Sequence, residues 1–180
     1  MIKSDPLWSV PVRLDEIPET GRRLELRAED AVRAAVAGAA GVVEIARLEA
    51  AFDLSRLGRE RLRVVGTVSA LVNQNCVVTL EPVETEVEEA IDLVFAPASE
   101  TASGAEPGEE AVALDGAADP PEPLVDGVAD LGAVAVEFLI LGIDPYPRKA
   151  GVAFEPQPGD DPGPKPFAAL AGLRTPRAKR

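Results

Sequence analysis

A chain of 180 residues has room for one domain with a buried core, plus tails. Its 18 basic and 31 acidic residues give a net charge of −13, which disfavours non-specific attachment to nucleic acid or membrane surfaces. One cysteine and no histidine exclude an internal disulfide, a Cys/His zinc site and the usual proton shuttle at neutral pH. No charge-free apolar run is long enough to span a bilayer and the amino terminus does not resemble a signal peptide, so we expect a cytoplasmic protein without metal or other cofactors.

The chain before the longest strands predicts three shorter strands and one helix. Residues 7–14 alternate loosely and include a proline without a ladder N–H, which indicates an edge strand. Residues 22–27 form a second strand. An alanine-rich helix follows over 29–37, with acidic residues in its first turn and two nearby glycines to end it. The period returns to two over 42–54, which predicts a third strand.

Residues 62–95 predict one long β-hairpin, around which the rest of the chain is organised. Apolar residues occupy alternate positions in two runs that meet at a short polar turn, Asn73-Gln74-Asn75. The second run has apolar side chains on one face. The opposite face carries Glu84, Glu86, Glu88 and Asp92. We expect the apolar face to form the core and the acidic face to meet water.

The composition changes abruptly after this hairpin. Residues 98–122 include several acidic side chains but no lysine or arginine, which predicts a mobile acidic insertion. A solvated loop is the simpler interpretation of this segment, and an acidic docking site is the alternative. A short strand over 123–126 and a helix over 131–143 follow, with Asp130 as the cap of the helix. The helix is apolar nearly all round, so we expect other elements to cover it.

Residues 151–180 form a tail rich in proline and glycine, for which we expect flexibility. Phe167 and Leu170 would share a face if this part became helical. Basic residues follow them at the carboxy terminus. An apolar anchor with a basic tip indicates a segment that folds on binding a partner. Residues 1–150 would then form the single domain.

Three stretches resemble the YceD family. The first is Gln74-Asn75-Cys76-Val77-Val78-Thr79-Leu80-Glu81-Pro82-Val83. The second comprises Asp130-Leu131-Gly132, Glu137-Phe138-Leu139 and Asp144-Pro145-Tyr146-Pro147-Arg148-Lys149. The third is Pro166-Phe167-Ala168-Ala169-Leu170. The resemblance implies a role in the accumulation of large-subunit ribosomal RNA.

Two sets of polar residues are candidates for recognition. Arg148 and Lys149 directly follow the rigid segment around Tyr146, and they are our first candidates for contact with RNA or a ribosomal protein. The amides of residues 73–75 would be exposed at a hairpin tip, although turn chemistry alone explains asparagine there. The acidic row of the hairpin would suit a solvated face or a basic partner better than a cation, because side chains along one strand do not converge.

Two residues could carry chemistry, and each has a structural alternative. Cys76 could be a nucleophile, but no histidine exists to activate it, and a small buried residue within a strand is the better interpretation. Glu137 could be a general acid in apolar surroundings, or it could pair with an arginine such as Arg148. No phosphate-binding loop, dinucleotide motif or catalytic triad can be assembled.

We therefore predict an α+β fold with a mainly antiparallel, strongly twisted sheet, two packed helices, and disordered acidic and carboxy-terminal segments. Barrel-like closure of the sheet is an open alternative. The resemblance implies a non-enzymatic factor in large-subunit biogenesis. Its partner would be a basic ribosomal protein shielded by the acidic faces, or precursor ribosomal RNA bound through basic residues. An enzyme of unknown reaction is the remaining alternative, and we expect a monomer that binds neither DNA nor membranes.

Overall fold

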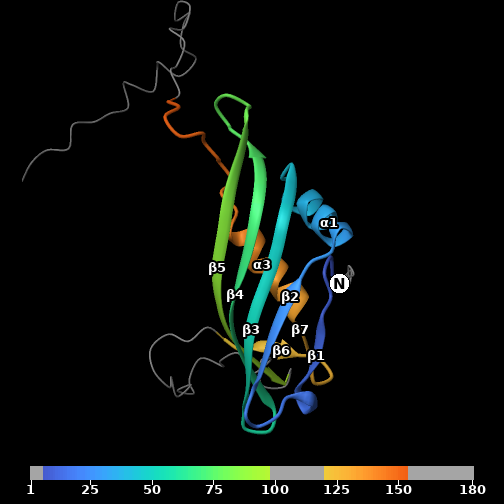
Figure 1. The fold of residues 1–180 in the computed structure, drawn as a ribbon. Coiled ribbons are helices and arrows are strands. Elements are labelled where there is room, and N and C mark those ends of the chain that lie inside the picture. The colour runs from blue at the N-terminus through green and yellow to red at the C-terminus, as the bar shows by residue number, and fades with distance from the viewer. Residues whose placement is uncertain (1–5, 98–119, 154–180) are drawn as a thin grey trace, which may run out of the picture.

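The computed structural model describes residues 6–97 and 120–153, which form a curved sheet with a helix on its inner face (Figure 1). The strands are β1 (Pro11–Arg13), β2 (Arg22–Arg27), β3 (Glu44–Leu57), β4 (Arg61–Asn75), β5 (Pro82–Pro97), β6 (Glu122–Leu124) and β7 (Val128–Asp130). The helices are α1 (Asp30–Ala40), α3 (Leu131–Gly142) and the short 3-10 helix η1 (Leu14–Glu16). The prediction of a mixed fold with a mostly antiparallel sheet is confirmed.

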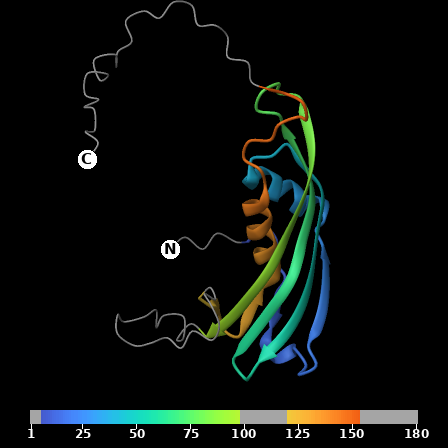
Figure 2. The same cartoon turned by 90° about the vertical axis from the view of Figure 1, so that its left-hand side faces the viewer.

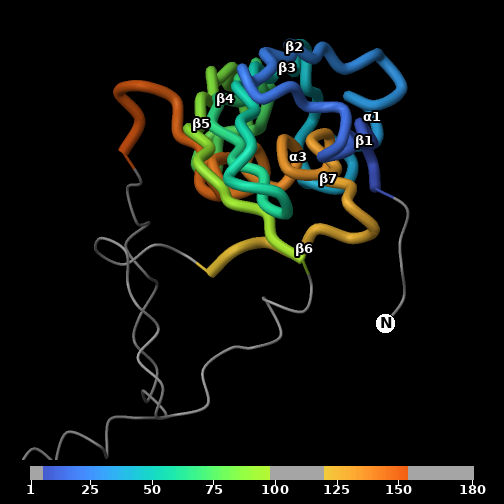
Figure 3. Tube along the Cα trace, turned by 90° about the horizontal axis from the view of Figure 1, so that it is seen from below, coloured from blue at the N-terminus to red at the C-terminus, as the bar shows by residue number. Residues whose placement is uncertain are grey.

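Five strands form the main sheet in the order β2-β3-β4-β5-β6, while β1 pairs with β7 in a separate two-stranded sheet. All neighbouring strands are antiparallel except β5 and β6. The alternative of barrel-like closure is wrong, because the edge strands β2 and β6 do not pair with each other. Seen along the strands, the sheet curves around α3, which occupies the space inside the curve (Figure 3).

Alternating side chains place one face of the sheet in the core, as the sequence predicted. Leu48, Phe52, Val64, Val68 and Ile91 are each at most 1% exposed. Burial of one such side chain contributes about 1.5 to 3 kcal/mol. Helix α3 lies across this inner face (Figure 2), because its sequence is apolar on nearly every side. The sheet and α3 together form the core.

The ends of the two main helices follow from local chemistry. The Asp130 carboxylate accepts hydrogen bonds from the N–H groups of Gly132 (3.1 Å) and Ala133 (3.2 Å), which confirms the predicted cap of α3. Helix α1 continues past its predicted last residue, Ala37, and past Gly38, the first of the two glycines predicted to end it. It stops at Gly41, whose φ of +68° is the left-handed conformation that closes a helix.

Close packing in the sheet makes Gly66 sensitive to substitution. Gly66 pairs with Phe52, and a Cβ there would lie 2.8 Å from Phe52 Cδ1 and closer still to the Ala51 carbonyl oxygen. Gly66→Ala should lower the free energy of unfolding by about 1 to 3 kcal/mol, the usual effect of overpacking. Urea denaturation of the wild type and the variant measures this difference.

Gly38 provides the matched control, since a Cβ there would meet nothing within 4 Å. Gly38→Ala should raise the free energy of unfolding by about 0.5 to 1 kcal/mol, because alanine favours the helix and restricts the unfolded chain. Equal stability of the wild type and Gly66→Ala would contradict the packing of β3 against β4.

Candidate functional site

The turn of the central hairpin lies later in the chain than the sequence predicted. β4 continues through Asn75, which pairs with Pro82 of β5. Asn73, Gln74 and Asn75 therefore belong to the strand, and residues 76–81 form the turn. The regular pairing of the two strands overrides the local preference of asparagine for turns.

The hairpin turn is closed by its own backbone. Cys76 N–H donates to the Glu81 carbonyl oxygen (2.8 Å), and Leu80 N–H donates to the Cys76 carbonyl oxygen (2.9 Å). Leu80 has a φ of +61°, a conformation that is uncommon for a large side chain. Its side chain is 76% exposed. The turn thus holds an apolar side chain in solvent, and such outliers often occur at functional positions.

The three amide residues before the turn have different environments. Gln74 is only 8% exposed, and its Nε2 donates to the Asp144 carbonyl oxygen (3.0 Å). Asn73 Nδ2 donates to the Glu44 carboxylate (3.1 Å), whereas Asn75 is exposed. The prediction of a jointly exposed amide set is wrong, because the tertiary fold buries Gln74 as a link to the segment after α3.

The segment that follows α3 is bound to the hairpin turn at three points. Val77 N–H donates to the Pro147 carbonyl oxygen (2.9 Å). Lys149 N–H donates to Cys76 Sγ (3.4 Å), and Lys149 Nζ pairs with the Glu81 carboxylate (2.9 Å). Two distant stretches that the sequence treated as separate motifs therefore form one structural unit.

This unit exposes a mixed patch, which we call the tip surface: Val77, Leu80, Tyr146, Arg148 and Lys149. Val77 is 45% exposed and Tyr146 is 70% exposed. Arg148 and Lys149 are also exposed, although Lys149 is already paired with an acid. Tyr146 and the basic residues belong to one short segment, and the hydrogen bond from Val77 N–H to the Pro147 carbonyl joins the hairpin turn to that segment. An exposed aromatic ring and an exposed guanidinium on the same short segment are groups that can bind unpaired bases and phosphates.

Cys76 lies at the centre of the tip and is completely buried. The interpretation of a small buried residue is confirmed, but its predicted place within a strand is wrong, since it begins the turn. A hydrogen bond from the Thr79 side chain, with further bonds from the N–H groups of Lys149, Thr79 and Val78, lowers the pKa of the Cys76 thiol to about 6, against the opposing effect of burial. Its thiolate is thus stabilised as a hydrogen-bond acceptor inside the tip.

Glu137 does not have the surroundings that the sequence predicted. Its side chain lies on the exposed side of α3, and it forms no ion pair with Arg148 or with any other residue that the structure describes. The predicted pairing with an arginine is therefore wrong. Its exposed side chain lies at the border of an open, mostly apolar hollow that Phe95 of β5 and Val134 also line, so it is not buried in apolar surroundings.

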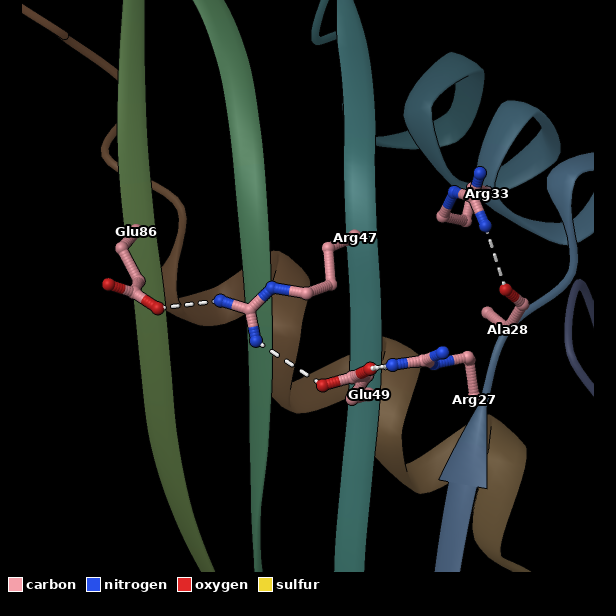
Figure 4. Close-up of polar contacts among 6 residues, drawn as sticks. All are labelled: Arg27, Ala28, Arg33, Arg47, Glu49 and Glu86. Carbon is pink, nitrogen blue, oxygen red and sulfur yellow. Dashed lines mark hydrogen bonds and ion pairs between the residues drawn. The ribbon is translucent and has the colours of Figure 1, made fainter.

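Arginines on neighbouring strands neutralise part of the outer face of the sheet (Figure 4). Arg47 of β3 donates to Glu86 of β5 (2.6 Å) and to Glu49 (3.3 Å), and Arg27 of β2 also bonds to Glu49. These four side chains link β2 to β5 across the sheet. The acidic face predicted for the second run of the hairpin is thus partly neutralised, because cross-strand neighbours of opposite charge pair on it.

The rest of the acidic row on β5 differs from one position to the next. Asp92 pairs with Arg63 of β4 (2.8 Å). Glu84 and Glu88 are exposed and form no ion pair within residues 6–97 and 120–153. The predicted solvated face therefore retains two uncompensated carboxylates on its outermost long strand.

Several predicted features lie outside the described residues. These are Phe167 and Leu170 of the tail and residues 98–119 of the acidic insertion. In the ranges that the structure describes, no three Cys, Asp or Glu side chains are placed as a metal site requires. None of the helices there combines the length and apolarity that crossing a bilayer needs.

Sequence reasoning did not select Glu81, Asp144 or Pro147, although each holds the tip together. All three occur in the first two stretches that resemble the YceD family, and this membership was the signal by which the sequence could have pointed to them. Their partners lie about 70 residues away along the chain, and no local pattern predicts such contacts. The positions were therefore visible, but their pairing was not.

The hydrogen bonds to Cys76 predict an unusually acidic thiol. In the folded protein the ultraviolet absorbance of the thiolate should appear with a midpoint near pH 6, compared with the ordinary value of 9.0. Because folding lowers this pKa, the thiolate contributes to stability above pH 9.0, and that contribution is lost as the pH falls through about 6. As the pH is lowered from 9.0 to below 6, the difference in unfolding free energy between the wild type and Cys76→Ala should therefore become smaller.

Thr79→Val is the control, since it removes the side-chain hydrogen bond that contributes most to the lowered pKa. The midpoint should rise in this variant. A wild-type midpoint near 9.0, unchanged by Thr79→Val, would contradict the proposed hydrogen bonds around Cys76.

Comparison with known proteins adds one result to this geometry. Residues 64–174 match the family model described as "Large ribosomal RNA subunit accumulation protein YceD". No curated protein and no solved structure matches the chain. The matched range contains β5, α3 and both stretches that meet at the tip. The chain therefore belongs to the YceD family, as the resemblance of its motifs implied.

Proposed function

We propose that this protein is a non-enzymatic, cytoplasmic factor that supports the accumulation of large-subunit ribosomal RNA by binding a component of the assembling subunit. The family assignment supports the process. The tip surface supports the binding role, because contacts such as Val77 N–H to the Pro147 carbonyl bring two family stretches into one exposed patch. This convergence is the observation that carries the proposal.

Precursor ribosomal RNA is the partner that best suits the tip surface. Tyr146 offers an exposed ring on which a base can stack, and Arg148 offers a guanidinium for phosphate. The strongly negative net charge limits RNA contact to places that are locally basic. We therefore expect a small and specific RNA contact at the tip.

A second candidate is RNA-independent shielding of a basic ribosomal protein. The observation that favours it is the pair of uncompensated carboxylates, Glu84 and Glu88, on the outer face of β5. Charge complementarity of this kind accelerates association with a cationic partner. The two candidates use different surfaces, so separate substitutions can test them.

The first test removes the two tip side chains that suit RNA. Tyr146→Ala/Arg148→Ala should reduce the ratio of large-subunit to small-subunit ribosomal RNA in cells whose only copy of the protein is the variant. The loss of one stacking ring alone corresponds to about 1 to 3 kcal/mol of binding. Quantification of total RNA measures the ratio, and thermal unfolding of the purified variant checks its fold.

Leu57→Ala/Arg59→Ala is the matched control, since both residues are exposed at the other end of β3 and β4. This variant should retain the normal RNA ratio. A folded tip variant with a normal ratio would contradict the role of the tip.

Capture of the tagged full-length protein from lysate, with and without nuclease, separates the two candidates. Under RNA binding, large-subunit ribosomal RNA is captured, and any ribosomal protein disappears after nuclease treatment. Retention of a basic ribosomal protein after complete nuclease digestion would instead support shielding.

A further inference from the structure

Strand β5 has a long edge without a strand partner in the part of the chain that the structure describes. β6 pairs with β5 only along residues 95–97. Along residues 83–94, β5 borders β4 on one side and no strand on the other (Figure 1). An uncovered edge of this kind presents a row of backbone N–H and C=O groups to another chain.

The hydrogen bonds at the hairpin turn show which residues of β5 face outward. Cys76 and Glu81 are bonded through Cys76 N–H and the Glu81 carbonyl oxygen. Bonded and non-bonded pairs alternate in an antiparallel ladder, and the register of β4 with β5 continues from this pair without a shift. Odd-numbered residues of β5 therefore bond to β4. The even-numbered residues from 84 to 94 direct their N–H and C=O groups away from the sheet.

The same even-numbered residues carry the acidic row. Glu84, Glu86, Glu88 and Asp92 all have exposed side chains on the outer face. Arginines on β3 and β4 neutralise Glu86 and Asp92, which leaves the other two carboxylates available. A strand added at this edge would place every second side chain beside these acids.

The remaining side chains of an added strand would lie on the inner face. There they would lie beside the odd-numbered residues of β5, which are apolar except for Thr85 and for Glu89, whose side chain lies against Gly142 of α3. The edge is therefore complementary to a chain that alternates basic with apolar or small residues. Its free stretch of twelve residues, 83–94, corresponds to a span of roughly 40 Å at the usual rise of a strand.

We infer that the free edge of β5 binds a basic, extended polypeptide segment by strand addition. The carboxylates favour a cationic segment and repel the phosphates of RNA. A second copy that paired edge to edge would bring an identical acidic row against the first, which disfavours that arrangement, and we therefore assign the edge to a basic segment of another protein. This binding mode is independent of RNA contact at the tip, and either can fail while the other holds.

The probe is a synthetic ten-residue peptide of alternating lysine and valine, labelled for fluorescence anisotropy and titrated with the full-length protein. A bound antiparallel strand would use the lysine N–H groups to reach β5, whereas a parallel strand would use the valine N–H groups. Methylation of one of these two sets of backbone nitrogens should therefore abolish binding and reveal the strand direction. The peptide keeps its charge in both forms.

Two protein variants test the same edge from the other side. Glu84→Lys/Glu88→Lys should weaken peptide binding by about tenfold or more at low salt, as expected for close opposite charges. Glu16→Lys/Glu19→Lys makes the same change in net charge at exposed positions away from β5 and should bind like the wild type. Ala90→Pro removes one outward N–H without removing a carboxylate or a bond to β4, and it should also weaken binding.

Absence of binding to the unmodified peptide would overturn the inference. Binding that survives both methylated forms would also overturn it, because attraction between charges would then suffice without backbone pairing. Neither result would bear on the RNA measurements made with the tip variants.

Discussion

The register between β4 and β5 is the constraint on which the rest of the structure depends. It runs without a shift from the pair Leu62 and Phe95 to the pair Asn75 and Pro82. A slip of one residue would move every buried side chain of β5 to the solvent face, so the hydrophobic core enforces this pairing. The same register fixes the turn at residues 76–81 and aligns the acidic side chains with the outward backbone groups of β5.

The tip shows how a small number of polar contacts can create a surface from distant parts of a chain. Gln74 is buried to reach the Asp144 carbonyl, and Cys76 is buried to accept the Lys149 N–H. Because both side chains are buried, neither can contact a bound RNA or protein directly. Their effect is to hold the turn against the segment after α3, so that both segments expose their side chains at the same end of the fold. The positions of the exposed residues that could bind a ligand therefore depend on buried residues that cannot contact it.

Charge on this protein is organised locally, although its net value is strongly negative. On the outer face, arginines of β2, β3 and β4 pair with acids across the strands, and only part of the acidic row of β5 remains uncompensated. Lys149 pairs with Glu81 at the tip, while Arg148 next to it is exposed. The net charge therefore describes solubility and long-range steering better than it describes any one surface.

The sequence by itself determined where the long strands lie, because alternation in Val64, Val68 and Ile91 is a local signal of a half-buried strand, and it determined the α3 cap at Asp130, but it did not predict β7. The family motifs were also visible as residues. Only the tertiary structure decided that the sheet remains open, that Gln74 is buried and that the two motif stretches touch. The last two features depend on contacts between residues about 70 positions apart, and a local pattern carries no information about which distant backbone group will satisfy a buried amide or thiol.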